Sequence, residues 1–306
     1  MQQYLNPFAT LGLAPDSLGN PPDGDRLRLE KKRLLAEFEL SRSATIALGH
    51  RQLDKSTVLR LFNQLEDPHI HAFHAALYRE PRLLAFLEDA TLDLFFSGDI
   101  ALVYRLPEEL RQFMAPYFAA QFNRRLLHAF RQNDWEEIDA LCLHPLPIAV
   151  AHHAACYQDS HRLVHSRVQE IQQLAEQVGG GQTPGAEIQE VCDEMRILAL
   201  NRLPDYFAAL RDRYALALEA LALAVHNTHR RVLLGVFIAR QALKLRIGDE
   251  TRARLEHILA QLQKLAPAES WIEGVGEHLR QGGGRQSWWF AAAGVGAVLL
   301  LLWLLS

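Results

Sequence analysis

We predict an all-α fold for this chain of 306 residues, and three observations lead to that prediction. Apolar residues recur at helical spacing through most of the sequence. Strand-like alternation is scarce; its best run, residues 100–106, is short and isolated, and a lone strand cannot satisfy its own backbone. The final apolar run has the length of a membrane-spanning helix. We therefore expect an N-terminal three-helix domain, an irregular helical body and a single C-terminal transmembrane helix.

Composition excludes several classes of protein. With 49% hydrophobic and 22% charged residues, the chain is not intrinsically disordered. The formal net charge of −4 lacks the basic excess of a nucleic-acid-binding surface, so we expect no nucleic-acid partner. The three cysteines are too few for a disulfide framework and favour a reducing compartment. No phosphate-binding loop, nucleophile elbow or zinc-protease motif occurs, so we predict neither an enzyme nor a bound cofactor.

Periodicity locates the helices of the body. Residues 188–199 place apolar side chains on one helix face, and residues 255–262 repeat this pattern in a helix that starts at Asp249 or Thr251. Residues 108–132 fit a helix pair interrupted near Pro116, and Asn133 or Asp134 is expected to cap the next helix.

The apolar runs 214–225 and 232–239 are each too short to span a membrane, and a cluster of charged and polar residues separates them. We read them as one long helix outside the membrane. The glycine-rich stretches 179–185 and 281–286 are predicted linkers. The expected segments are a helical domain at 1–80, a second at 81–178, a linker at 179–186, a helical bundle at 187–266, a juxtamembrane linker at 267–286 and the anchor at 287–306.

The last apolar run predicts a tail anchor. Residues 288–305 carry no charge and would form a helix of about 27 Å, close to the thickness of the hydrocarbon core. Indole side chains belong at membrane interfaces, and this run has Trp288 and Trp289 at one end and Trp303 near the other. Basic residues precede the run and none follows it, so the bulk of the chain is expected in the cytoplasm. Ala292 and Gly296 have the small-xxx-small spacing that weakly supports a homodimer.

Three N-terminal stretches resemble a J-domain, the module by which co-chaperones engage Hsp70-class chaperones. They are NPFATLGLAP at 6–15, RLRLEKKRLLAEFEL at 26–40 and LFNQLEDPHIHAFH at 61–74. J-domains carry a His-Pro-Asp tripeptide after the second helix, but here that place holds Glu39, Leu40 and Ser41. The resemblance therefore implies a degenerate J-like domain that does not stimulate an ATPase in the usual way. The alternative is a similar helical hairpin that arose without kinship.

Basic residues in the stretch 26–40 form a candidate partner-binding face. Leu27, Leu34 and Phe38 belong to an apolar stripe, whereas Arg28, Lys31 and Lys32 point elsewhere. The basic side chains suit an acidic protein partner or the anionic cytoplasmic leaflet. The alternative is a solvated face on which Glu30 and Glu37 offset the basic charge.

A second set of candidates combines histidine and cysteine. His152 with Cys156 and His161 with His165 are both spaced i, i+4, and four such ligands would suit zinc if the two pairs met. The spacing matches no known zinc pattern, and the alternative is that cysteines fill the core while histidines stay partly exposed.

Two hypotheses for the function follow. The first is a membrane-tethered, non-enzymatic adaptor associated with chaperones, which binds a cytosolic protein. The second is a helical sensor that binds a metal or ligand through residues 142–165.

Overall fold

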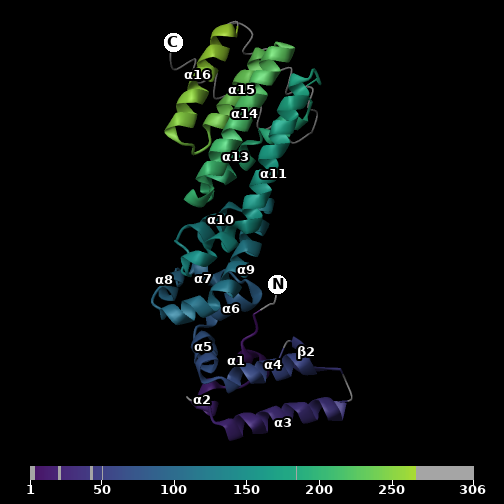
Figure 1. The fold of residues 1–306 in the computed structure, drawn as a ribbon, viewed down its shortest axis with the longest axis vertical. Coiled ribbons are helices and arrows are strands. Elements are labelled where there is room, and N and C mark those ends of the chain that lie inside the picture. The colour runs from purple at the N-terminus through teal and green to yellow at the C-terminus, as the bar shows by residue number, and fades with distance from the viewer. Residues whose placement is uncertain (1–3, 20–21, 42–43, 50, 184, 267–306) are drawn as a thin grey trace, which may run out of the picture. The chain divides into compact units, whose positions relative to one another are not determined.

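The computed structural model describes residues 4–266 apart from residues 20–21, 42–43, 50 and 184. The described chain is mostly helical, which confirms the all-α prediction at the level of fold class, although one small β-hairpin interrupts the helices (Figure 1). The expected juxtamembrane linker and anchor lie outside the described residues. Of the helices in residues 4–266, none combines the length and the apolar composition that crossing a membrane requires.

The chain divides into two compact units, residues 1–160 and 161–306, and α11 contributes residues to both. Unit 1 contains, in chain order, α1 (Pro7–Leu11), α2 (Pro15–Leu18), α3 (Gly24–Ser41), β1 (Thr45–Leu48), β2 (Arg51–Asp54), α4 (Lys55–Glu66), α5 (Pro68–Tyr78), α6 (Pro81–Asp89), α7 (Asp93–Phe96), α8 (Ile100–Val103), α9 (Glu108–Gln132), α10 (Trp135–Cys142), the 3-10 turn η1 (Val150–His152) and the start of α11 (His153–Gly179). Residues 100–103 are thus helical, as the absence of a strand partner implied.

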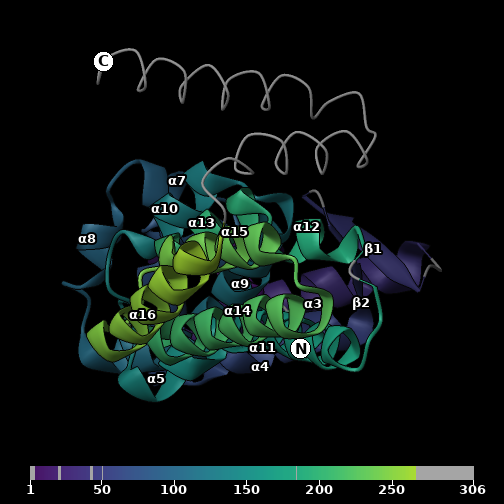
Figure 2. The same cartoon turned by 90° about the horizontal axis from the view of Figure 1, so that it is seen from above.

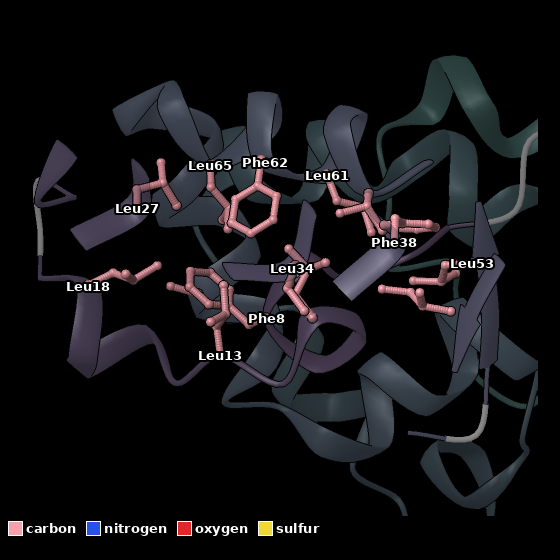
Figure 3. Packing of buried hydrophobic residues seen from close by; sticks show 14 residues of the cluster. Phe8, Leu13, Leu18, Leu27, Leu34, Phe38, Leu53, Leu61, Phe62 and Leu65 are labelled. Carbon is pink, nitrogen blue, oxygen red and sulfur yellow. The ribbon is translucent and has the colours of Figure 1, made fainter. Parts of the chain in front are cut away.

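Residues 4–78, with α1 to α5 and the hairpin, are called the N-terminal module below. β1 and β2 pair antiparallel, with Thr45 opposite Asp54, and they connect α3 to α4. Leu27 near the start of α3 lies beside Leu65 near the end of α4, so the two helices run antiparallel (Figure 3). Phe8 from α1 inserts into the same cluster of buried side chains. The module therefore has one apolar core built from segments that are distant in the sequence.

Residues with short polar side chains cap the N-termini of several of these helices. The Asn6 side chain accepts a hydrogen bond from the Phe8 backbone N–H at 3.0 Å, and Asp54 accepts one from Thr57 at 2.7 Å. Asp134 accepts one from the Glu137 N–H at 3.0 Å, which confirms it as the cap of α10. Each cap satisfies a backbone donor that the first helical turn leaves without a partner.

The prediction of an interruption near Pro116 is wrong, because α9 continues through that residue. Proline removes one backbone donor from a helix and crowds the preceding turn. Pro116 lies on an exposed side of α9, so the carbonyl that loses its helical partner can reach water. The neighbouring Met114, Ala115 and Phe118 are fully buried, and their packing holds the helix together across this site.

Unit 2 contains the later part of α11, then α12 (Glu187–Val191), α13 (Glu194–Arg202), the 3-10 turn η2 (Asp205–Phe207), α14 (Ala208–His229), α15 (Val232–Leu243) and α16 (Asp249–Leu265). α14, α15 and α16 pack against one another as a three-helix bundle (Figures 1 and 2). The expected helix start at Asp249 is confirmed. α11 ends at Gly179, at the start of the glycine-rich stretch that the sequence marks as a helix breaker.

Two expected single helices are each divided. The expected helix over 214–239 ends at His229 and resumes at Val232, because Arg230 adopts a left-handed conformation with φ of 57° and closes the C-terminus of α14. The expected helix over 188–199 breaks between α12 and α13, where the Asp193 side chain accepts a hydrogen bond from the Met195 N–H at 2.9 Å. Apolar periodicity continues across the break at Asp193 and gave no sign of it, whereas the polar residues 226–231 interrupt the apolar pattern at the break near Arg230.

Arg211 on α14 is a charged side chain buried within unit 2, with 1% of its surface exposed. Its guanidinium donates hydrogen bonds to the backbone carbonyl oxygens of Leu203 at 3.0 Å, Pro204 at 3.2 Å and Arg246 at 2.9 Å. These carbonyls belong to the segments after α13 and after α15. Arg211 thereby fixes two connections of the bundle with one side chain.

A glycine substitution tests the N-terminal turn. Gly12 ends α1 with φ of 68°, a conformation that side chains disfavour, although a Cβ there would meet nothing within 4 Å. We expect Gly12→Ala to lower the free energy of unfolding of the module by about 1 kcal/mol through backbone strain alone. Hydrogen exchange of residues 4–18 in the full chain measures this change.

The matched control is Gly24→Ala at the start of α3, where there is also open space and φ is not in the left-handed region. We expect this substitution to leave the stability unchanged or to raise it slightly. Equal losses at both glycines would contradict the role assigned to the turn.

Candidate partner-binding surface

One side of α3 is fixed by packing against α4. Leu27, Leu34 and Phe38 are buried in the core that the two helices share (Figure 3). At the edge of this contact the Lys31 ammonium group lies 2.9 Å from a Glu66 carboxylate oxygen and 3.1 Å from the Asn63 side-chain oxygen. Lys31 therefore faces α4, and its charge already has a partner within the module.

The opposite side of α3 carries exposed apolar and basic side chains. Leu29 and Leu40 expose 66% and 85% of their surface, values far above those of ordinary core leucines. Arg33 and Ala36 lie between them at the helical spacing i, i+4, i+7, i+11, so these residues share one face. We call the following set the α3 outer face: Arg28, Leu29, Lys32, Arg33, Ala36 and Leu40.

The basic side chains of the α3 outer face make few ion pairs within the fold. An Arg28 guanidinium nitrogen lies 3.7 Å from an Asp25 carboxylate oxygen, and the Arg33 Nε lies 2.9 Å from a Glu30 oxygen. Arg28 and Asp25 are exposed neighbours on one helix, where an ion pair contributes only a few tenths of a kcal/mol, whereas the Glu30 side chain that contacts Arg33 is partly buried. Lys32 makes no ion pair within the part of the chain that the structure describes. These cations remain accessible to a negatively charged partner.

The structure thus divides the three basic residues that the sequence grouped together. Arg28 and Lys32 point outward, whereas Lys31 is used within the fold. Sequence reasoning missed the exposed leucines Leu29 and Leu40. The signal was present, because neither residue falls on the stripe of Leu27, Leu34 and Phe38.

The segment between α3 and α4 differs from the simple three-helix expectation. Glu39 and Leu40 lie in the last turn of α3, and the hairpin of β1 and β2 follows before α4 begins. The expected third helix at 61–74 is divided, since Asp67 ends α4 and caps α5 with a hydrogen bond from the His69 N–H at 2.8 Å. The degenerate J-like assignment remains a proposal that rests on the sequence.

A buried polar cluster joins the first residues of the chain to α5 and α6. The Asn6 backbone N–H donates to one Glu88 carboxylate oxygen at 2.7 Å, and the Arg51 guanidinium donates to the other at 3.0 Å. The Asn6 amide also donates to the His74 carbonyl oxygen at 2.9 Å. Tyr4 completes the cluster with its hydroxyl 2.9 Å from His74 Nδ1. Sequence reasoning did not identify this cluster.

The histidine and cysteine candidates do not assemble. His152 lies in η1 and Cys156 is fully buried near the start of α11, whereas His161 and His165 lie further along that helix in unit 2. The ring of His161 contacts Tyr206 and Phe207 instead, with centroids 5.9 Å and 6.2 Å away. Within the described residues, no group of three or more potential metal ligands comes together. The alternative sensor hypothesis therefore gains no support here.

The cysteines are also poor nucleophiles. Burial raises the pKa of the thiols of Cys142, Cys156 and Cys192 to about 12 in each case. At neutral pH these thiols stay protonated, and the thiolate is the reactive form. Their environment suits side chains that fill space in the core.

The anchor residues Trp288, Trp289 and Trp303 lie outside the described residues, so the interfacial role expected for them stays a prediction. Comparison of the chain with protein-family models, with curated proteins and with solved structures finds no match in any of the three.

Proposed function

We propose that the protein is a non-enzymatic adaptor whose α3 outer face binds a partner protein while its C-terminal apolar segment anchors it in a membrane. The observation that carries the binding role is a pair of exposed leucines on a helix whose other side is fixed by α4, with cations beside Leu29 and the exposed Glu37 and Glu39 beside Leu40. A rigid helix loses little conformational entropy when its exposed side is covered.

The chemistry of this face indicates the kind of partner. Burying a leucine side chain contributes about 1.5–3 kcal/mol, so two of them can anchor an interface. Arg28, Lys32 and Arg33 place positive charge around Leu29, which favours an acidic rim at that end of the partner's groove, whereas Leu40 lies beside Glu37 and Glu39. An Hsp70-class chaperone is the partner that the J-like resemblance implies. Because the His-Pro-Asp tripeptide is missing, binding would recruit the chaperone without stimulating its ATPase.

The anchor would act by raising the local concentration of the partner at the membrane. A tethered module binds a neighbour as an intramolecular event, which raises avidity without any new contact. The uncharged run 288–305 and its terminal tryptophans support this part of the proposal.

Binding can be tested with the full-length protein in detergent and a purified Hsp70-class chaperone. We expect Leu40→Ser combined with Lys32→Glu to weaken binding at least about 10-fold, because the pair removes an apolar anchor and reverses a charge. The control is Leu265→Ser at the end of α16, a leucine that exposes 56% of its surface against 85% for Leu40. Binding that is unchanged in the double variant would contradict the proposed surface, and a stimulated ATPase would contradict recruitment without activation.

Membrane attachment has its own test. Full-length protein is expected in the pellet after detergent-free lysis and high-speed centrifugation, and deletion of residues 288–305 is expected to move it to the supernatant. A full-length protein that stays in the supernatant would rule out the tether and leave the binding surface unaffected.

A further inference from the structure

Two buried histidines lie beneath the first residues of the chain. His71 and His74 are one helical turn apart on α5, and each exposes only 1% of its surface. The Phe8 ring lies edge-on to the His71 ring with centroids 5.1 Å apart, and the Tyr4 ring lies 5.8 Å from the His74 ring. The two imidazoles are therefore part of the contact between the segment Tyr4–Leu11 and α5, beside the hydrogen bond from the Asn6 amide to the His74 carbonyl and the packing of Phe8 on Tyr78.

The hydrogen bonds around His74 indicate which protonation state the fold requires. The Asn6 amide donates to the Tyr4 oxygen at 3.4 Å, so we assign the Tyr4 hydroxyl hydrogen to His74 Nδ1, 2.9 Å away. Nδ1 must then be an unprotonated acceptor. A second proton on the ring would place an N–H opposite the tyrosine hydroxyl hydrogen and break this bond.

The surroundings of neither imidazole would stabilise a positive charge on the ring. Both ring nitrogens of His71 and Nε2 of His74 are buried without a hydrogen-bond partner among the described residues. A buried imidazolium would need acceptors or a carboxylate within contact distance. Glu88 is the nearest acidic member of the cluster, and its two oxygens are already occupied by the Asn6 N–H and Arg51.

No carboxylate on the described elements around α5 makes a hydrogen bond with either imidazole. α9 contributes the aromatic rings of Phe113 and Tyr117, which contact His74 and Tyr4. On α4, Glu66 pairs with Lys31 of α3. The ionisable groups on the elements packed around the two histidines, with their caps and Tyr4 and Arg51 of the cluster, are Tyr4, Arg51, Asp54, Lys55, Arg60, Glu66, Asp67, His69, Tyr78, Arg79, Glu80, Arg82, Glu88, Asp89, Glu108, Glu109, Arg111, Tyr117, Arg124, Arg125, His128 and Arg131.

We propose that His71 and His74 form an acid-sensitive latch, in which protonation of either ring releases the segment Tyr4–Leu11 from α5. Release withdraws the fully buried Phe8 from the core of the module and exposes apolar surface on α4 and α5. The inference does not depend on the proposed adaptor role, since it rests on contacts within unit 1 alone.

The direction of the pH dependence follows from the cost of charging these rings. Burial, reinforced by the neighbouring His71, lowers the pKa of His74 to about 4, and burial also lowers the pKa of His71. In the released state both rings return to the ordinary pKa of about 6.5 and bind protons more readily. The closed state is therefore fully stable above about pH 6.5 and loses stability as the pH falls toward 4. Each histidine that binds a proton raises the equilibrium constant for opening by up to about 10-fold for each pH unit that the pH falls in that range.

Hydrogen exchange of the full-length protein in detergent provides the test. Peptides covering residues 4–18 are compared at pH 7.5 and pH 5.0 after correction for the intrinsic pH dependence of exchange. We expect the corrected opening equilibrium of the wild type to rise by at least about 10-fold at pH 5.0. No rise in the wild type would overturn the latch.

Two variants separate the latch from a general loss of stability. His71→Leu combined with His74→Asn removes both titrating rings, and the asparagine oxygen can still accept the Tyr4 hydroxyl. We expect the pH response of residues 4–18 to disappear in this double variant. His69→Asn is the control, because His69 is exposed on the same helix and its variant should respond like the wild type.

A double variant that responds to pH as strongly as the wild type would overturn the proposal. If the double variant does not fold, NMR titration of the imidazole rings in the wild type tests the latch instead. We expect His71 and His74 to remain neutral well below pH 6.5, and a ring that titrates at its ordinary pKa while the segment stays closed would overturn the latch.

Discussion

Replacing Arg211 with methionine is expected to destabilise unit 2 by about 3–5 kcal/mol. The guanidinium donates to the backbone carbonyls of Leu203, Pro204 and Arg246; the bond to Leu203 is buried and the other two are partly buried. Methionine preserves much of the side-chain length and volume, so the loss comes from buried acceptors that no longer have donors.

Denaturant-dependent hydrogen exchange of α13, α14 and α15 in the full chain measures this effect. Arg213→Met is the matched control, because Arg213 is exposed on the same helix and its removal should change stability by less than about 0.5 kcal/mol. Arg211→Lys should fall between the two, since an ammonium group keeps the charge but cannot reach all three carbonyls. Similar stability of the Arg211→Met and Arg213→Met variants would contradict the role of the buried guanidinium.

The second large effect is expected for Phe8→Ala in the N-terminal module. Phe8 is completely buried, packs in the cluster that joins α1, α3 and α4, and contacts the rings of His71 and Tyr78 at 5.1 Å and 6.1 Å. Truncating a buried phenylalanine to alanine costs about 3–5 kcal/mol, from lost apolar burial and from the cavity that remains. The protection of α4 and α5 amides at neutral pH should fall accordingly.

Phe96→Ala is the control for this substitution. Phe96 exposes 60% of its surface at the end of α7. Its truncation therefore deletes a ring that is largely in contact with water, whereas the ring of Phe8 is packed in a core. A change within about 0.5 kcal/mol is expected. If Phe8→Ala were equally mild, the first residues of the chain would not contribute to the core of the module.

Local signals in the sequence predicted local structure well. The stripe of Leu27, Leu34 and Phe38 correctly indicated the buried side of α3, and Asp134 and Asp249 marked where two helices begin. These features depend on neighbours within a few turns of the same helix. The hairpin was missed, although Gly49 with φ of 59° near its turn is the kind of residue that tight turns need.

Contacts between distant segments could not be predicted from periodicity. The pattern of α3 showed which residues point away from the core, but it did not show that Lys31 would reach Glu66, 35 residues later. The polar residues 226–231 likewise did not show that Arg230 would adopt a left-handed conformation and end α14. The polar cluster was missed for the same reason, since Tyr4 and His74 are 70 positions apart.

The carboxylate of Glu88 has a consequence for the order in which the protein folds. It accepts the backbone N–H of Asn6 from 82 residues upstream, and its second oxygen accepts Arg51. During synthesis Asn6 leaves the ribosome long before α6 has been translated. The contact between Asn6 and Glu88 can therefore form only after α6 has also left the ribosome. Until then the backbone N–H of Asn6 lacks its final acceptor, although the residues of α3, α4 and α5 that pack on Phe8 all precede α6 in the chain.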